Sequence, residues 1–154
     1  MKLGISYNLF DGEELLEYSI QSVRNSADHI NVVYQKISNW GEPCSENLED
    51  LLSDLVKKKL IDKIYCYTPK NTSAGKNELH KRNIGLNIAK ARFCSHFHNM
   101  DCDEFYHKNQ FDEAKNLLSP IKSRLHLANL STTLNNQLGK FKTIQQHMFP
   151  LLPK

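Results

Sequence analysis

Apolar residues gather in four short runs along the chain, and each run has the length and composition of a buried strand. Polar or turn-forming residues bound the runs, as Asn8 and the Asp11-Gly12 pair do after the first. Short runs rich in branched and aromatic side chains are typical of central strands of a sheet. The predicted strands are residues 3–7, 29–34, 63–67 and 95–100.

Between these runs the apolar residues recur at helical spacing. Asp11 is placed to cap the first helix, and Gly85 indicates a close contact of the third helix with a neighbour, because glycine inside a helix costs about 1 kcal/mol relative to alanine. The residues available for packing in the third helix are Leu79, Ile84, Leu86, Ile88 and Ala89. The predicted helices are residues 13–23, 47–58 and 77–91, with a short one at 111–118.

The alternation of strands and helices predicts an α/β fold with a mainly parallel, Rossmann-like sheet and helices on both faces. Ligands of such sheets bind beyond the carboxyl ends of the strands. Four segments fall at these ends, and we expect them to cluster in space although they are far apart in sequence. They are Asn8, residues 35–40, residues 68–75, and the pair Asp101 and Asp103.

The last of these segments carries the clearest candidate chemistry. Asp101 and Asp103 flank Cys102 at the end of the fourth predicted strand, and Glu104 follows. Mg²⁺ and Mn²⁺ prefer oxygen ligands of this kind, and clustered carboxylates favour a bound cation. An isolated pair of this spacing is also typical of a solvated acidic turn, so the interpretation depends on the residues upstream.

Composition and charge narrow the class of protein. The 154 residues, with 40% hydrophobic and 24% charged residues, fit one globular domain or a part of one, and no apolar run has the roughly 18 residues of a membrane span. The net charge of +3 hides a basic segment, because residues 114–154 carry six cations and no Asp or Glu. Such a sparse basic segment gives little support for nucleic-acid binding, and is compatible with a location on the inner face of a membrane.

The four cysteines are scattered and form no CxxC pair, which argues against a zinc ribbon and favours a cytoplasmic chain with reduced thiols. Cys66 and Cys94 lie in or beside predicted strands, so we expect both to be buried.

Three segments resemble the nucleotide-binding half of a family 2-like glycosyltransferase with the GT-A fold. They are the opening ISYNLFDGEELLEYSIQSV, the helix KRNIGLNIAKA from Lys81 to Ala91, and the strand HFHNMDCDEFY with its DxD motif. The resemblance covers residues 1–118, which we take as a nucleotide-sugar-binding domain; residues 119–154 form a C-terminal segment with no clear strand pattern.

The resemblance implies a metal-dependent glycosyltransferase that uses a nucleotide-sugar donor and Mn²⁺ or Mg²⁺. Asp103 would bind the metal directly, and Asp101 would contact the ribose, or the metal through water. Asn8 would lie near the base, and Arg82 would contact phosphate or Asp101, unless it is an ordinary surface arginine of its helix. The acceptor would be a glycan or glycolipid.

The chain departs from the family in lacking a catalytic base. Inverting enzymes of this fold use a carboxylate well after the DxD motif, and here no Asp or Glu follows Glu113. A truncated, non-catalytic nucleotide-binding or interaction module is therefore an alternative. Another is a metal-dependent phosphotransfer enzyme that uses Asp101, Asp103 and His98.

Several other residues have both a functional and a structural interpretation. His96 and His98 share one face of a strand and are candidate metal ligands, although packing is the more common role of such histidines. Trp40 can stack on a base or sugar, or cover the core. The C-terminal segment is apolar enough that we expect it to support a homodimer or larger oligomer.

Overall fold

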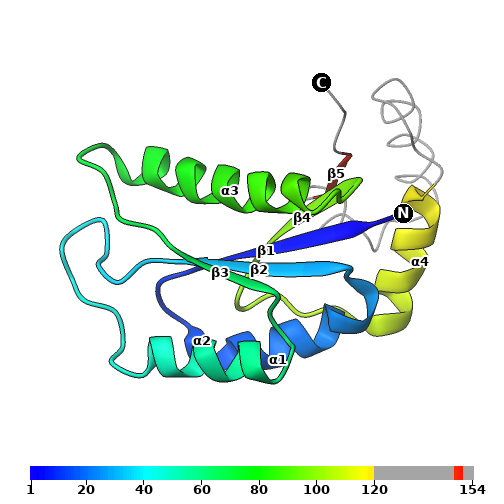
Figure 1. The fold of residues 1–154 in the computed structure, drawn as a ribbon, viewed down its shortest axis with the longest axis horizontal. Helices are drawn as coiled ribbons and strands as arrows, with labels where there is room; N and C mark the ends of the chain where they lie inside the picture. The colour runs from blue at the N-terminus through cyan, green and yellow to red at the C-terminus, as the bar shows by residue number, and fades with distance from the viewer. Residues whose placement is uncertain (120–147, 151–154) are drawn as a thin grey trace.

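The computed structural model describes residues 1–119 and 148–150, and these form a five-stranded sheet flanked by helices (Figure 1). The strand order is β3-β2-β1-β4-β5. All pairings among the first four strands are parallel, which confirms the predicted α/β fold. The strands are β1 (Leu3–Leu9), β2 (His29–Tyr34), β3 (Lys63–Cys66), β4 (His96–Asp101) and β5 (Met148–Pro150).

Strand β5 adds an antiparallel edge to the sheet, with Phe149 opposite Phe97 in the register. The sequence pattern did not predict it, because it is a three-residue strand that ends in Pro150. Proline is tolerated in a sheet mainly on edge strands, where its missing N–H breaks no ladder. The rest of the C-terminal segment and the oligomer expected from it lie outside the described residues.

The helices cover both faces of the sheet, as predicted. α1, α2 and α4 lie on one side and α3 on the other (Figure 1). The helices are α1 (Glu13–Val23), α2 (Leu48–Lys57), α3 (Ala74–Ala91) and α4 (Lys108–Leu118), with a 3₁₀ turn η1 (Arg24–Ser26) after α1. None of the helices in the described part of the chain has the length and apolar character that crossing a membrane requires.

The two faces of the sheet pack by different means. Strand alternation sends Leu3, Ile5 and Tyr7 of β1 into a large apolar core, which they share with α1, α2 and α4. The intervening residues Gly4 and Ser6 point at α3. The α1–α2 face is therefore stabilised mainly by burial of apolar side chains. The α3 face combines small and polar groups with a small apolar cluster of Ala89, Cys94 and Phe97.

A stripe of small and polar residues on α3 contacts the sheet. These residues repeat every fourth position and are buried: Asn77, Lys81, Gly85 and Ala89. Of the apolar residues expected to pack, Ala89 is fully buried, but the side chain of Leu79 is 57% exposed. The prediction for Leu79 was wrong because Leu79 lies two residues from both Asn77 and Lys81, which places it on the face of the helix opposite the buried stripe.

The close approach centres on Gly85. A Cβ atom at this position would lie 2.0 Å from Oγ of Ser6 and 2.6 Å from its Cβ. The Ser6 hydroxyl donates to Oδ1 of Asn31 at 2.7 Å, and Nδ2 of Asn31 donates to the carbonyl of Gly85 at 3.4 Å. The expected tight packing of Gly85 is confirmed, and buried hydrogen bonds accompany it.

Two local predictions were wrong. Asp11 does not cap α1. Gly12 takes the cap position with φ 79°, and its backbone N–H donates to Oδ1 of Asp11 at 2.9 Å. Cys66 is exposed because β3 is an edge strand, whereas Cys94 is buried as expected.

We predict that Gly85→Ala lowers the free energy of unfolding by about 1–3 kcal/mol, because the added methyl group overlaps Ser6. Urea denaturation measures the change. Gly75→Ala is the matched control in the same helix, since a Cβ there meets no atom within 4 Å. The control should leave stability unchanged or raise it by up to about 1 kcal/mol.

The Ser6→Gly background tests the cause, since it removes both colliding atoms and should reduce the cost of Gly85→Ala. Equal stability of G85A and G75A would contradict the packing described for α3.

Candidate functional site at the carboxyl edge of the sheet

The strand order changes direction at β1, and this places two predicted site residues side by side. The chain passes from β1 to β2 and β3 on one side, then returns through α3 to β4 on the other side of β1. Such a reversal leaves a crevice at the carboxyl ends of the two strands. Asn8 of β1 is the register partner of Asp101 of β4, so both residues lie at this crevice.

Three buried amide side chains at this edge keep polar atoms without a partner. Nδ2 of Asn8 donates to Oδ1 of Asn99 at 3.1 Å, but Oδ1 of Asn8 and Nδ2 of Asn99 are unpaired within the described residues. Oε1 of Gln35, whose backbone N–H donates to Leu9, is also unpaired there. These three amides are at most 8% exposed. An unpaired buried polar atom costs about 1–3 kcal/mol, so the cluster suits a ligand that completes its hydrogen bonds.

The DxD segment forms a turn that holds its two carboxylates outward. Cys102 is buried, and its thiol donates to the carbonyl of Asp11 at 3.3 Å. Burial raises the pKa of this thiol, and the charges of Asp103 and Asp101 raise it further, so Cys102 stays protonated. The exposed side chains of Asp101 and Asp103 flank this anchor.

Glu104 closes the same turn. Its Oε2 accepts from the N–H of Asp101 at 2.9 Å, and its own N–H donates to the carbonyl of Asp101 at 3.2 Å. The backbone carbonyl of Glu104 accepts from the hydroxyl of Ser19 in α1, which ties the turn to the core. The carboxylate of Glu104 therefore supports the turn.

Charged residues of α3 form a series of ion pairs that ends at Asp101. Glu78 pairs with Nζ of Lys81 at 3.0 Å and with Nε of Arg82 at 2.9 Å. Nη2 of Arg82 reaches Oδ1 of Asp101 at 3.4 Å, which is the contact expected of an arginine at this place in the sequence. The side chain of Lys81 is only 7% exposed, so α3 brings a buried positive charge to the crevice side of the sheet.

Asn77 joins the two loops that follow β2 and β3. Its Oδ1 accepts from the hydroxyl of Tyr67 at 2.7 Å and from the N–H of Lys70 at 3.0 Å. Its Nδ2 donates to Oδ1 of Asn39 at 2.8 Å. A pocket of about 530 Å³ lies between these loops, with residues 36–39 on one wall and residues 66–72 on the other.

The structure thus brings Asn8, Arg82 and Asp101 together, and places Asp103 at the outer end of the same turn. Sequence reasoning missed three residues of this edge, Asn77, Lys81 and Asn99, and it included Gln35 only as part of the segment 35–40. A four-residue repeat of buried polar and small positions in α3 was the available signal for Asn77 and Lys81. Gln35 and Asn99 sit in or beside apolar strands, where the pattern alone does not separate an inward amide from an outward one.

Both histidines of β4 are buried, and Nδ1 of His96 lies 3.1 Å from the hydroxyl of Ser95. The ring of His98 lies 5.7 Å from that of Tyr106 and 6.0 Å from that of Phe111, in contact with the α4 side. In the described part of the chain, no group of three His, Cys, Asp or Glu side chains is arranged to hold a metal ion. The side chain of Trp40 is 80% exposed, so it does not cover the core.

Comparison with known proteins gives the fold but no family. No family model and no curated protein matches the chain. Among solved structures, a mannosyltransferase from Pyrobaculum calidifontis in complex with GDP-Man and Mn²⁺ matches with a TM-score of 0.55 and 13% identity over 76% of this chain. A second match is to residues 1–349 of TarS from S. aureus, with a TM-score of 0.47 and 16% identity over 77% of this chain.

The chain spans about a third of the length of each matched structure, 32% in both cases. The match to the mannosyltransferase shows that the chain has a glycosyltransferase-like α/β fold, in accord with the fold expected from the sequence.

We predict that Asn77→Ala destabilises the chain by about 1–3 kcal/mol, because it leaves the buried hydroxyl of Tyr67 and the N–H of Lys70 without their acceptor. Urea denaturation measures the loss, and faster amide hydrogen exchange at Lys70 reports the freed loop. Asn87→Ala, at an exposed position of the same helix, is the control and should have little effect. Matching stabilities for N77A and N87A would show that Asn77 does not hold the loops.

Proposed function

We propose that the chain is the nucleotide-sugar-binding part of a metal-dependent glycosyltransferase. The observation that carries the proposal is the buried amide cluster of Asn8, Gln35 and Asn99, whose unpaired polar atoms lie at the same strand ends as the DxD turn. A ligand with polar edges can satisfy the amides while its phosphates reach the acidic turn. A nucleotide diphosphate joined to a sugar has this combination of groups.

The residues of the turn fit a divalent cation. Asp101 and Asp103 supply two exposed carboxylates, and the described residues provide no third ligand of the His, Cys, Asp or Glu type. Mg²⁺ and Mn²⁺ commonly take one or two protein carboxylates and complete their shell with water and substrate phosphates. The cation would stabilise the negative charge of the departing diphosphate. The Mn²⁺ and GDP-Man in the mannosyltransferase of similar fold support this assignment.

Arg82 and Lys81 would supply positive charge beside the phosphates of the donor. Arg82 is about one-third exposed and holds Asp101 through a single contact at 3.4 Å, long enough to be exchanged for a phosphate oxygen. Lys81, buried beside Glu78, adds positive charge that a diphosphate would partly neutralise. These residues would orient the donor.

The pocket between the two loops suits the nucleoside. Its volume of about 530 Å³ is in the range of small-molecule sites, and Tyr67, Pro69 and Ile37 give it apolar surface beside the polar Asn39 and Thr68. Trp40, in the loop that forms one wall, presents an exposed ring that can stack on a base or sugar.

One observation favours a second function, that of a nucleotide-binding module without transfer activity. Residues 114–154 contain no Asp or Glu, so this stretch supplies no carboxylate that could act as the base that inverting enzymes place after the DxD motif. Glu104, the carboxylate nearest the DxD motif, already accepts a hydrogen bond within the turn. Phosphotransfer has less support, because His98 packs against Tyr106 and Phe111.

Calorimetric titration with UDP, GDP and CDP, each with and without Mn²⁺, tests the proposal. We expect one of the nucleotides to bind more tightly with Mn²⁺, and Asp103→Ala to abolish that metal dependence. Asp50→Ala removes an exposed carboxylate from α2 and should leave the metal dependence unchanged. The proposal fails if the folded protein binds none of the three nucleotides in a metal-dependent manner.

Donor assays separate the two functions. Transfer or hydrolysis of a nucleotide sugar would establish an enzyme. Metal-dependent nucleotide binding without either reaction, across UDP-, GDP- and CDP-linked sugars, would establish the binding module.

A further inference from the structure

A second hollow lies at the opposite edge of the sheet, where the parallel strands begin. It has a volume of about 280 Å³ and is lined by Lys2, Asp28, His29, Asp62 and Arg92. Lys2 precedes β1, His29 begins β2, and Arg92 follows the last residue of α3. The proposed nucleotide site lies at the other end of the same elements, so this hollow has no part in it.

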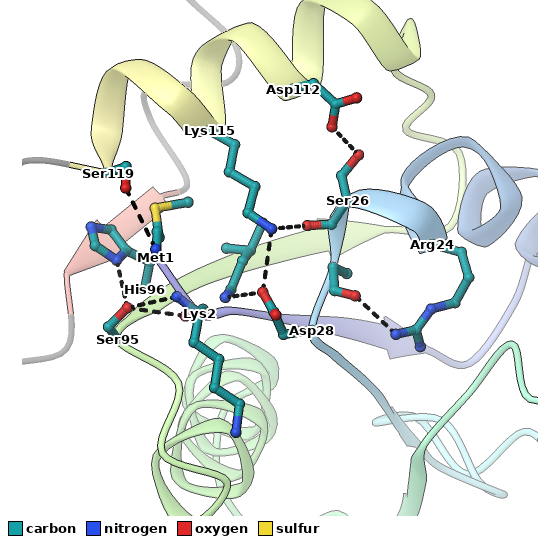
Figure 2. Close-up of polar contacts among 12 residues, drawn as sticks. Met1, Lys2, Arg24, Ser26, Asp28, Ser95, His96, Asp112, Lys115 and Ser119 are labelled. Carbon is teal, nitrogen blue, oxygen red and sulfur yellow. Dashed lines mark hydrogen bonds and ion pairs between the residues drawn. The ribbon is translucent and has the colours of Figure 1, made fainter.

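Both carboxylates that line the hollow already have hydrogen-bond and ion-pair partners. Oδ2 of Asp28 accepts from the first N–H of β1 at 2.8 Å and lies 3.3 Å from Nζ of Lys115 (Figure 2). Oδ2 of Asp62 accepts from Nη1 of Arg24 at 2.7 Å and from an N–H of β2 at 2.7 Å. Although burial alone would raise the pKa of Asp62, the hydrogen bonds from Arg24 and the backbone lower it. Each carboxylate is therefore neutralised by its own cation.

Two cations of the hollow are left without a carboxylate. Nζ of Lys2 donates to the backbone carbonyl of Arg92 at 2.7 Å, so the two residues are held together. Within the described residues, the guanidinium of Arg92 makes no hydrogen bond or ion pair. Lys2 and Arg92 thus give the hollow an excess of two positive charges.

His29 forms a buried wall of this hollow. Its side chain is 7% exposed, its Nε2 has no partner within the described residues, and its Nδ1 lies 3.8 Å from Asp62. Burial lowers the pKa of His29; Asp62 opposes this, and the nearby charges of Arg92, Arg24 and Lys2 lower it further. The imidazole is thus neutral. The positive charges of Arg92, Arg24 and Lys2 that lower its pKa would also attract an anion in the hollow.

We propose that this hollow binds a small oxyanion, either inorganic phosphate or the phosphate of a phosphomonoester, held by the guanidinium of Arg92 and the ammonium of Lys2. Arginine offers paired donors that match two oxygens of a phosphate. Lysine adds a positive charge on a flexible side chain, which can adjust to the position of the ligand. The proposal rests on the amino edge of the sheet alone and is independent of the proposed function.

Titration of the ¹⁵N-labelled full chain with inorganic phosphate tests it, without divalent cations and with ionic strength held constant by NaCl. We expect saturable shifts of the amides of Lys2, His29 and Arg92, and binding weakened about tenfold or more in Arg92→Gln. Lys2→Gln is a second variant with the same expected direction. Lys90→Gln, an exposed lysine of the same helix outside the hollow, is the control and should bind as the unchanged chain does.

Arg82→Gln separates this hollow from the carboxyl-edge site, because Arg82 in the middle of α3 contacts Asp101 at the carboxyl edge, whereas Arg92 follows the last residue of α3 at the hollow. Loss of phosphate binding in R82Q but not in R92Q would assign the anion to the carboxyl edge and overturn the proposal. Shifts that do not saturate, or equal binding by R92Q, K2Q and K90Q, would overturn it as well. A parallel titration with glycerol phosphate identifies the source: tighter binding than phosphate supports a phosphomonoester, and equal binding supports the free ion.

Discussion

The close contact between α3 and the sheet is the constraint on which the rest of the structure depends. Gly85 lets the helix approach until a side-chain Cβ would collide with Ser6, and Gly4 and Ala89 repeat this arrangement near the amino ends of the strands. At this separation small residues of the helix face the strands, and the apolar cluster on this side is small. The position of the helix is instead fixed by shape and by hydrogen bonds such as that from Asn31 to the carbonyl of Gly85. The placement of Arg82 beside Asp101 follows from this contact.

The amide cluster shows the cost of this arrangement. Asn8 and Asn99 bond to each other, yet each keeps an unpaired polar atom, in a part of the molecule where apolar residues of the same size would pack without penalty. The α1–α2 face is occupied mainly by apolar residues such as Leu16, Leu52 and Ile5. Most of the apolar burial is thus on the α1–α2 face, whereas the α3 face holds amides whose unpaired polar atoms a ligand can satisfy.

The parts of the structure that the sequence predicted are those that depend on local periodicity. The four parallel strands were predicted from apolar runs. The predicted bounds of β2 agree with the observed ones at both ends, because its six residues are all buried. Asn8 and Asp101 were predicted as neighbours because parallel strands bring their carboxyl ends to one edge. Cys66 was predicted as buried and Leu79 as available for packing, and both are exposed. The edge position of a strand and the face that a helix turns toward the sheet are properties of the assembled fold.

The two edges of the sheet differ in how their charges are balanced. At the amino edge Asp28 and Asp62 each have a cation and a backbone N–H, so Lys2 and Arg92 remain in excess. At the carboxyl edge Asp101 has one long contact to Arg82, and Asp103 has no ion pair within the described residues, so negative charge remains in excess. Arg82 within α3 and Arg92 just after its last residue therefore lie beside opposite net charges, although only ten positions separate them. An added anion stabilises the amino edge and an added cation stabilises the carboxyl edge, so the sheet keeps the two kinds of ligand apart.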